Sequence, residues 1–210
     1  MLETVLKNLR WLGHDGFLLK AAGKTIVFDP YGAANPEKAD IILISHEHFD
    51  HCSPEDVAKF AGPDTVIITE PMAAAKLTGG VRTMKPGDTI QVHGITVTAT
   101  AAYNIGKPFH PKSNQWLGFL VTVDGVTVYH AGDTDLIPEM ADVRCDIALL
   151  PVSGTYVMTF EEAAEAARRI KPAVAVPMHY GAIVGTKDDA EKFAAALKGE
   201  IRVEFLAGSF

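Results

Sequence analysis

Three histidines and two carboxylates lie within six consecutive residues, in the segment His46-Glu47-His48-Phe49-Asp50-His51. The apolar run at residues 41–44 comes directly before them, and the end of a buried strand is a common place for a functional loop. Imidazoles this close together would repel one another if charged and would be costly to bury without partners. A divalent cation that binds neutral imidazole and carboxylate groups accounts for the cluster. Zinc suits such ligands, and manganese and iron are the alternatives.

Two further segments place a metal-ligand type of residue directly after a short β-type run. Gly132-Asp133-Thr134 follows the run at 126–130, and Met178-His179-Tyr180-Gly181 follows the run at 173–177. Asp133 could instead cap a helix that starts nearby, since aspartate does so routinely. His179, taken alone, would be interpreted as a histidine satisfied within the core. Together with the first segment, both become candidate metal ligands.

The pattern H-x-H-x-D-H after an apolar strand, followed by the Asp133 and His179 segments in this order, resembles the metallo-β-lactamase superfamily over nearly the whole chain. Within it, Trp11-Leu12-Gly13-His14, Phe28-Asp29-Pro30 and the segment 129–135 resemble the small metal-dependent hydrolases of bacteria and archaea. Relatives of these include L-ascorbate-6-phosphate lactonase and N-acylphosphatidylethanolamine phospholipase D. The resemblance implies an α/β fold, a four-layer αββα sandwich built from two similar halves.

The resemblance also implies two divalent metal ions, most readily zinc. One ion would be held by His46, His48 and His110, and the other by Asp50, His51 and His179, with Asp133 bridging the two. His110 departs from the usual pattern, because many superfamily members place this ligand in a Gly-His-Thr turn. Its rivals are His93, in a predicted hairpin turn, and His130, at a strand end. We favour His110 because it lies in the long loop at 103–116.

Three residues near the predicted ligands are candidates for other roles. Asp29 could orient a ligand histidine through hydrogen bonds, or it could simply form an Asp-Pro turn. The resemblance places the turn that holds His14 near the metals, so His14 is a candidate catalytic residue; the alternative is a histidine on a surface turn. Cys52 follows a ligand directly, and we expect it to be a small buried packing residue.

Two such ions with the ligand carboxylates Asp50 and Asp133 would leave a local charge of about +2. A small anionic substrate could therefore bind, although the net charge of the chain is −7. A water shared by ions ~3.5–4 Å apart loses its proton near neutrality, and the hydroxide attacks carbon or phosphorus. We expect Asp50 to position this hydroxide, and we predict hydrolysis of a phosphoester or phosphodiester, with a phosphorylated sugar lactone as the alternative substrate.

Two loops are candidates for binding the substrate, since their residues suit a phosphate or sugar with an apolar portion. These residues are Tyr103, Asn104, Lys107, Lys112, Asn114, Trp116 and the segment Ser153-Gly154-Thr155-Tyr156. A flavodiiron-type redox protein shares the fold, but such sites usually carry Glu where His48 stands, and the chain has no flavin domain. A non-catalytic metal-binding module would be expected to have lost a ligand, and all seven ligand positions are filled.

The elements that must position these residues are mostly strands, because short runs rich in Val, Ile, Thr and Phe alternate with Gly and Pro. Strands are expected at 3–12, 16–21, 24–28, 40–44, 65–69, 95–101, 116–123, 126–130, 146–150, 173–177 and 202–206. Helices are expected at 54–60, 71–77, 159–170 and 187–198. The helix at 159–170 has the clearest boundaries, since Thr159 and Glu162 form a capping-box spacing and Pro172 ends it.

One segment of the chain is repeated. Residues 16–25 and 118–127 align without gaps, and five of the ten positions are identical. Each copy has the form of a strand, a Gly turn and a second strand. This repeat indicates a fold built from two similar halves, and we expect the functional site to lie where the halves meet.

Length and composition agree with one globular domain over residues 1–210, because 48% of the residues are hydrophobic and 21% are charged. The longest basic run is Arg168-Arg169, so no nucleic-acid partner is expected. There is neither an apolar stretch of ~18 residues nor a leader-like start, which predicts a cytoplasmic protein without membrane association. Cys52 and Cys145 are expected to be free thiols. The sequence is compatible with a homo-oligomer.

Overall fold

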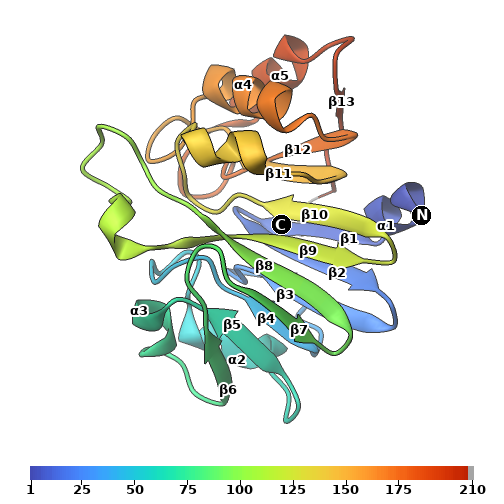
Figure 1. The fold of residues 1–210 in the computed structure, drawn as a ribbon, viewed down its shortest axis with the longest axis vertical. Coiled ribbons are helices and arrows are strands. Elements are labelled where there is room, and N and C mark those ends of the chain that lie inside the picture. The colour runs from blue at the N-terminus through green and yellow to red at the C-terminus, as the bar shows by residue number, and fades with distance from the viewer. Residues whose placement is uncertain (208–210) are drawn as a thin grey trace.

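The computed structural model describes residues 1–207, which form two β-sheets packed face to face with helices on both outer faces (Figure 1). The strands of the first sheet are, in order, β1 (Leu9–Gly13), β2 (Gly16–Ala21), β3 (Lys24–Phe28), β4 (Ile41–Leu43), β5 (Val66–Thr69) and β6 (Gly80–Thr83). The second sheet contains β7 (Thr89–Val92), β8 (Ile95–Ala101), β9 (Leu117–Val123), β10 (Val126–His130), β11 (Ile147–Pro151), β12 (Val174–Met178) and β13 (Arg202–Val203). The expected αββα sandwich is confirmed.

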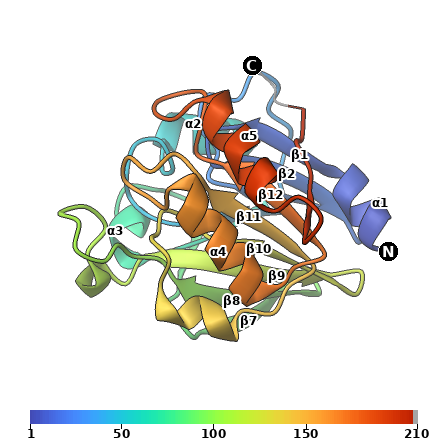
Figure 2. The same cartoon turned by 90° about the horizontal axis from the view of Figure 1, so that it is seen from above.

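The helices cover the two sheets from outside, and Figure 2 shows α4 and α5 lying over the second sheet. They are α1 (Leu2–Lys7), α2 (Pro54–Phe60), α3 (Pro71–Ala74), α4 (Phe160–Ile170) and α5 (Lys187–Ala196), with the 3₁₀ turns η1 (Lys112–Asn114) and η2 (Pro138–Asp142). The capping box of α4 forms as predicted, because the Thr159 and Glu162 side chains each bond the other's backbone N–H. None of the helices in the described residues is both long and apolar enough to cross a lipid bilayer.

Successive side chains of a strand point to opposite faces of its sheet, so the apolar side chains of the first sheet pack into two separate layers, one on each face. Phe17 and Phe28 face the interior between the sheets and share one cluster with Phe119 of β9. Leu18, the residue next to Phe17, belongs instead to a second cluster with Phe60 of α2. Phe60 is fully buried, which stabilises the fold by about 2 kcal/mol relative to an exposed side chain. The first sheet is thus apolar on both faces, as strands covered on both sides must be.

The predicted relation between two halves is confirmed by the strand pairings. In both β1–β6 and β8–β13, two antiparallel pairings are followed by three parallel ones. The repeated hairpins have matching turns, since φ is positive at Ala22 and Gly23 and again at Asp124 and Gly125. The two turns touch, and Ala22 N donates to Asp124 Oδ2 at 2.9 Å.

The strand predicted over 3–12 is wrong in its first half, because residues 2–7 form the helix α1. Val5 and Leu6 are buried there, with Glu3 in the first turn and Lys7 in the last, which suits the helix dipole. The prediction misses β6 and β7, whose residues are largely exposed and show little apolar alternation. The helix predicted over 71–77 ends at Ala74. The strand predicted over 202–206 is limited to its first two residues.

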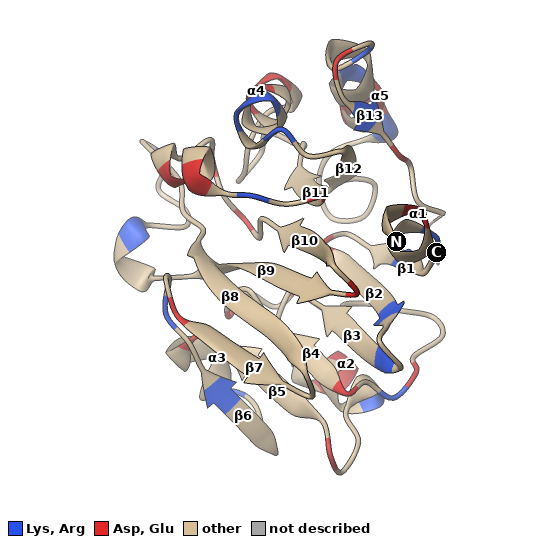
Figure 3. Cartoon of the chain, turned by 45° about the vertical axis from the view of Figure 1, so that its right-hand side comes forward, with Lys and Arg blue, Asp and Glu red and all other residues tan. Residues whose placement is uncertain are grey.

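Charged side chains of both signs are spread over helices and turns in the view of Figure 3, and the strand faces carry few of them. Several pair with each other across the surface, for example Arg168 with Glu200 at 2.7 Å. Such exposed pairs add little stability, about 0–1 kcal/mol each.

Candidate metal centre

The predicted ligands come together at one end of the sandwich, where loops follow the carboxyl ends of the parallel strands. These loops follow β4, β10, β11 and β12, and the β1–β2 turn and the β8–β9 loop join them. One sheet contributes His14, His46, His48, Asp50 and His51, and the other contributes His110, Asp133 and His179. The site is therefore built where the two halves meet.

His46, His48 and His110 form the first group, in which one ring nitrogen of each lies within 4.8 Å of the others. His46 Nε2 is 2.9 Å from His48 Nδ1. His46 and His110 are buried, and His48 is half-buried. The indole of Trp116 packs beside His46 with the ring centroids 4.6 Å apart. The three nitrogens are spaced as ligands of one ion would be.

Asp50, His51 and His179 lie in a second group that also contains His14, again with ligand atoms within 4.8 Å of one another. His51 Nε2 is 3.9 Å from Asp50 Oδ2. The His51 and His179 side chains are almost completely buried. This group matches the predicted second ion, with His14 as an addition.

Asp133 lies between the two groups. Its Oδ2 atom is 3.2 Å from His110 Nε2 and 3.3 Å from His179 Nε2. Its Oδ1 atom is 3.4 Å from His51 Nε2. Gly132, with φ of 63°, allows this approach, because a Cβ atom there would lie 2.6 Å from the Leu117 carbonyl oxygen. Asp133 therefore contacts both groups, as the bridging role requires.

Four of the five histidines that are predicted ligands contact another residue through their remaining ring nitrogen, which is typical of metal ligands. His51 Nδ1 donates to Asp29 Oδ2 at 2.8 Å. His46 Nδ1 lies 2.9 Å from Ser45 Oγ, which donates to Asp29 at 2.6 Å. The other two contacts are His179 Nδ1 to Ser153 Oγ at 2.8 Å and His110 Nδ1 to Asn104 Nδ2 at 3.2 Å. Asp29 thus holds in place two of the histidines that are predicted ligands, His51 directly and His46 through Ser45.

The unpaired atoms of the centre fit a bound cation. With Nδ1–H donated to Asp29, the lone pair of His51 Nε2 faces Asp133 Oδ1, and neither atom has a hydrogen-bond partner. Two acceptors facing each other in a buried site need a positive charge between them. In the metal-free protein, a proton on His51 supplies this positive charge. Burial disfavours the protonated imidazole, but the negative charges of Asp133 and Asp29 outweigh burial and raise the pKa of His51 well above its usual value.

In the first group, the pKa values of His46 and His48 are lowered, whereas that of His51 is raised. Burial, reinforced by the neighbouring His51, holds the pKa of His46 well below its usual value. Burial and the neighbouring His110 also lower the pKa of His48. Both imidazoles are therefore neutral near pH 7, which is the protonation state that binds a metal.

His14 is not a surface histidine, because only 1% of it is exposed. Its Nε2 atom lies 3.1 Å from Asp50 Oδ2. Burial alone would raise the pKa of Asp50, but the His14 hydrogen bond and the charge of His51 outweigh burial and lower it. The His14 carbonyl accepts hydrogen bonds from Trp11 Nε1 at 2.8 Å and His179 N at 3.2 Å. The structure thus brings His14 into the centre.

The two rivals of His110 lie outside both groups. His93 is exposed in the turn between β7 and β8. His130 is buried and stacks on Phe28 with ring centroids 5.3 Å apart. Its Nε2 atom lies 2.8 Å from the carbonyl oxygen of Asp15. Of the three candidates, His110 is the one whose ring nitrogen lies within a ligand group of the described residues.

Comparisons with known proteins agree with this geometry. A family model described as a beta-lactamase superfamily domain matches residues 8–179. The chain belongs to the beta-lactamase superfamily. It is 37% identical over 215 residues to a UPF0173 metal-dependent hydrolase of Methanoculleus marisnigri, covering 95% of this chain and 93% of that protein. It is 35% identical to the UPF0173 metal-dependent hydrolase Ta0764 of Thermoplasma acidophilum, with 90% and 91% of the two chains covered.

A solved structure shows the same fold. The crystal structure of a protein from Parabacteroides distasonis superposes on this chain with a TM-score of 0.85 at 36% identity, covering 94% of this chain and 91% of that one. The resemblance inferred from the sequence motifs is confirmed. The protein is a metal-dependent hydrolase of the metallo-β-lactamase family.

Sequence reasoning missed Asp15 as a residue of this hydrolase centre. Its side chain is 0% exposed, and one of its oxygens lies within 4.8 Å of ligand atoms of His51, Asp133 and His179. Burial and the nearby charge of Asp133 raise its pKa well above the usual value. The available signal was its place beside His14 in the Gly-His-Asp-Gly turn.

Most of the predicted substrate-binding residues make internal contacts instead. Lys107 pairs with Asp135, and Lys112 pairs with Glu139 at 2.7 Å. Ser153 contacts His179, as described above. Both cysteines are free thiols, as predicted. Burial raises the pKa of Cys52 to about 11, so that it is not a nucleophile at neutral pH.

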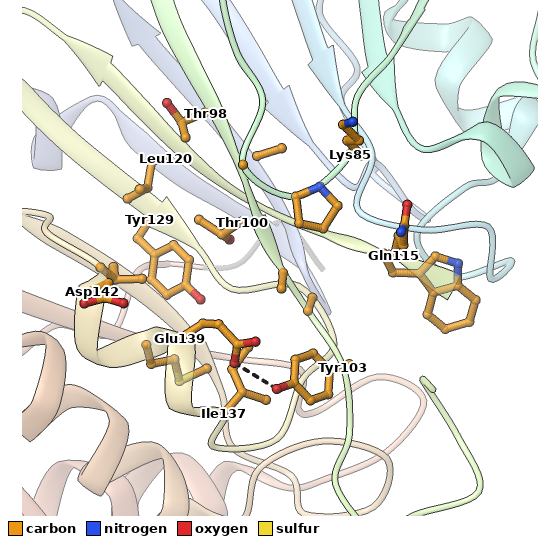
Figure 4. Close-up of a pocket in the computed structure, with 18 of the residues that line it drawn as sticks. Lys85, Thr98, Thr100, Tyr103, Gln115, Leu120, Tyr129, Ile137, Glu139 and Asp142 are labelled. Atoms are coloured by element: carbon orange, nitrogen blue, oxygen red, sulfur yellow. Dashed lines mark hydrogen bonds between the residues drawn. The ribbon is translucent and has the colours of Figure 1, made fainter. Parts of the chain in front are cut away.

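A cavity of about 550 Å³ lies on the outer face of the second sheet of the hydrolase (Figure 4). Trp116, which packs on His46, also lines this cavity. At one end, Tyr103 and Glu139 point toward each other and form a hydrogen bond of 2.8 Å. The cavity therefore shares a wall with the first histidine group.

Proposed function

We propose that this chain hydrolyses an ester-type bond of a small anionic substrate at a centre of two divalent metal ions, and that the bond is a phosphoester or phosphodiester. The position of Asp133 carries the proposal. One of its oxygens lies 3.2 Å from His110 of the first group and 3.3 Å from His179 of the second. A carboxylate that contacts both ligand groups suits the bridging of two ions.

The donor set fits two ions of the first transition row. His46, His48 and His110 would hold one ion, and Asp50, His51 and His179 the other, with Asp133 shared. Zinc, manganese or iron would supply a Lewis acid and lower the pKa of water toward neutrality. The outer contacts of the histidines, from Asp29 for example, support these roles because they fix the ligand rings.

Asp50 is the residue best suited to orient the attacking water. Its pKa is lowered, so that the carboxylate stays ionised near neutral pH and accepts a hydrogen bond. His14 holds one Asp50 oxygen at 3.1 Å, and the backbone of His14 is itself bonded to Trp11 and His179. His14 is thus a positioning residue that acts through Asp50.

Charge supports an anionic substrate. Two divalent ions with Asp50 and Asp133 leave about +2 at the centre, which attracts an anion into an otherwise acidic protein. In the described residues, neither carboxylate pairs with a lysine or arginine that would compensate it.

Aromatic side chains next to the ligands support an apolar portion of the substrate. Phe49, between His48 and Asp50, is 65% exposed and lies 5.8 Å from the Tyr31 ring. Phe109, adjacent to His110, is 47% exposed, and its ring is 4.7 Å from that of Tyr156. Exposed aromatics beside a polar centre are typical of ligand pockets.

The test is a substrate screen with metal-loaded protein. We expect turnover of aryl phosphodiesters or phosphomonoesters, and loss of turnover on chelation with recovery when manganese or zinc is restored. The Asp133→Asn variant should lose activity by at least about 100-fold. Protein that holds two ions per chain and hydrolyses no phosphoester, phosphodiester or lactone would refute the proposal.

A further inference from the structure

Asp15 lies in the two-residue turn that connects β1 and β2, where Gly13 pairs with Gly16. Both side chains of this turn are buried, because His14 is 1% exposed and Asp15 is 0% exposed. Turns on a protein surface normally direct such polar side chains into water. This turn instead directs two adjacent ionisable side chains into the metal centre.

Among the described residues, no N–H or hydroxyl group donates to either carboxylate oxygen of Asp15, and the acidic group that faces it is the Asp133 carboxylate, with which it could share only a proton or a cation. Asp15 Oδ2 lies 3.8 Å from His51 Nδ1, but that nitrogen already donates a hydrogen bond to Asp29 Oδ2 at 2.8 Å. Asp29 is a useful comparison, because it is equally buried and accepts three hydrogen bonds, two from Ser45 and one from His51. A buried carboxylate without donors is costly unless a cation lies against it.

The surroundings of Asp15 supply the other ligands of such a cation. One Asp15 oxygen, an Asp133 oxygen and one nitrogen each of His51 and His179 lie within 4.8 Å of one another. These three neighbours are also predicted ligands of the second ion or of both ions. Asp15 thus adds one more oxygen to a group that already contains two imidazoles.

The backbone of Asp15 is held in place from the other sheet. Its carbonyl oxygen accepts a hydrogen bond from His130 Nε2 at 2.8 Å. His130 Nδ1 in turn accepts from Gly132 N at 3.2 Å, directly before Asp133. His130 therefore links the Asp15 turn to the Asp133 loop and fixes the two carboxylates relative to each other.

We propose that Asp15 is a ligand of the second metal ion and makes the two metal sites chemically different. The inference rests on the proposed dinuclear centre and deepens it. The second ion then has three carboxylates, Asp15, Asp50 and Asp133, beside His51 and His179, whereas the first ion has three imidazoles and Asp133. Carboxylate oxygens suit manganese, and imidazoles suit zinc, so the second site prefers the harder ion.

A direct test compares metal binding by Asp15→Asn with binding by the wild-type chain. Metal-depleted protein is dialysed against defined free Mn²⁺ or Zn²⁺, and bound metal is measured by elemental analysis. We expect two equivalents for the wild type. We expect Asp15→Asn to keep the first equivalent and to bind the second Mn²⁺ at least about tenfold more weakly. The matched control is Asp124→Asn, at the exposed β9–β10 turn, which should behave as the wild type does.

Thermal melting separates ligation from a structural role. Without metal, Asp15→Asn should melt at the same temperature as the wild type or higher, because the amide is neutral at every pH whereas the buried Asp15 carboxyl must first take up a proton. With Mn²⁺, the wild type should gain more in melting temperature than the variant. If Asp15→Asn fails to fold, Asp15→Ser, which leaves no amide to bury, is measured in its place.

Unchanged affinity for both ions in Asp15→Asn would overturn the inference. So would a lower melting temperature without metal combined with an unchanged gain on adding Mn²⁺, since that combination indicates a structural residue. These measurements need no substrate. Absence of ester hydrolysis would therefore refute the proposed function while leaving the ligand role of Asp15 to be decided by metal binding alone.

Discussion

At the scale of single residues, the centre depends on carboxylates that each have a different set of partners. Asp29 accepts hydrogen bonds and orients His51, while Asp133 contacts both histidine groups. Asp50 is held by His14. In the proposed centre, the same residue type would thus support the ligands, bridge the ions and orient water, and the local donors decide which of these it does.

His14 should affect turnover more than metal content. The His14→Ala variant loses the hydrogen bond to Asp50 but leaves the seven predicted ligands intact. We expect it to keep two ions per chain and to lose about tenfold to about 100-fold in kcat, because the Asp50 carboxylate is no longer fixed. Elemental analysis and steady-state kinetics measure both quantities.

The conservative variant His14→Gln is the control, since its amide can still donate to Asp50. It should recover part of the lost kcat. A His14→Ala variant with wild-type kcat, or one that loses an ion, would contradict the positioning role.

At the scale of elements, the loops that carry ligands also carry exposed aromatics. Phe109 precedes His110 in the β8–β9 loop and meets Tyr156 of the β11–α4 loop edge to face. If these rings hold the apolar portion of the substrate, Phe109→Ala should raise KM about tenfold for an aryl phosphodiester and leave KM for a methyl one unchanged. Phe205, which is 44% exposed outside these loops, offers a matched control in Phe205→Ala. Equal KM changes for both substrates would argue against this contact.

The elements also explain what could be predicted from the sequence. The cluster from His46 to His51 stands out because its ligands share one loop after an apolar strand. Asp15 was harder to predict, because its place beside His14 is its one signal and a lone carboxylate in a turn has no spacing that distinguishes it from a solvated one. The strand predicted from residue 3 fails over residues 3–7 because Val5 and Leu6 suit either a strand or a helix. Packing of this segment against β1 and β2 stabilises the helix.

At the scale of the whole molecule, metal binding and folding stability are coupled through buried charge. In the metal-free protein, the Asp133 and Asp29 charges raise the pKa of His51 despite its burial. A histidine whose pKa is raised by folding stabilises the folded state fully below its ordinary pKa of about 6.5. This stabilisation is lost as the pH rises through the raised pKa of the folded state. Burial also raises the pKa of Asp15, so its contribution to folding stability likewise decreases as the pH rises. Metal ions replace these protons.

The metal-free protein should therefore lose stability as the pH rises above about 6.5, whereas the metal-loaded protein should not. Melting temperatures of both forms between about pH 6 and about pH 9 measure this difference. The gain in melting temperature on adding metal should increase with pH. A metal-free protein that becomes more stable over this range would show that the charges of the centre are balanced in another way.

We propose that hydrolysis needs two ions that share Asp133 as a ligand. The most direct measurement is a titration of metal-depleted protein with Mn²⁺ or Zn²⁺, in which bound metal and hydrolysis of an aryl phosphodiester are followed together. We expect little activity up to one equivalent of metal and a rise to full activity between one and two equivalents. Full activity at one equivalent, or two bound equivalents without hydrolysis of any ester-type substrate, would contradict it.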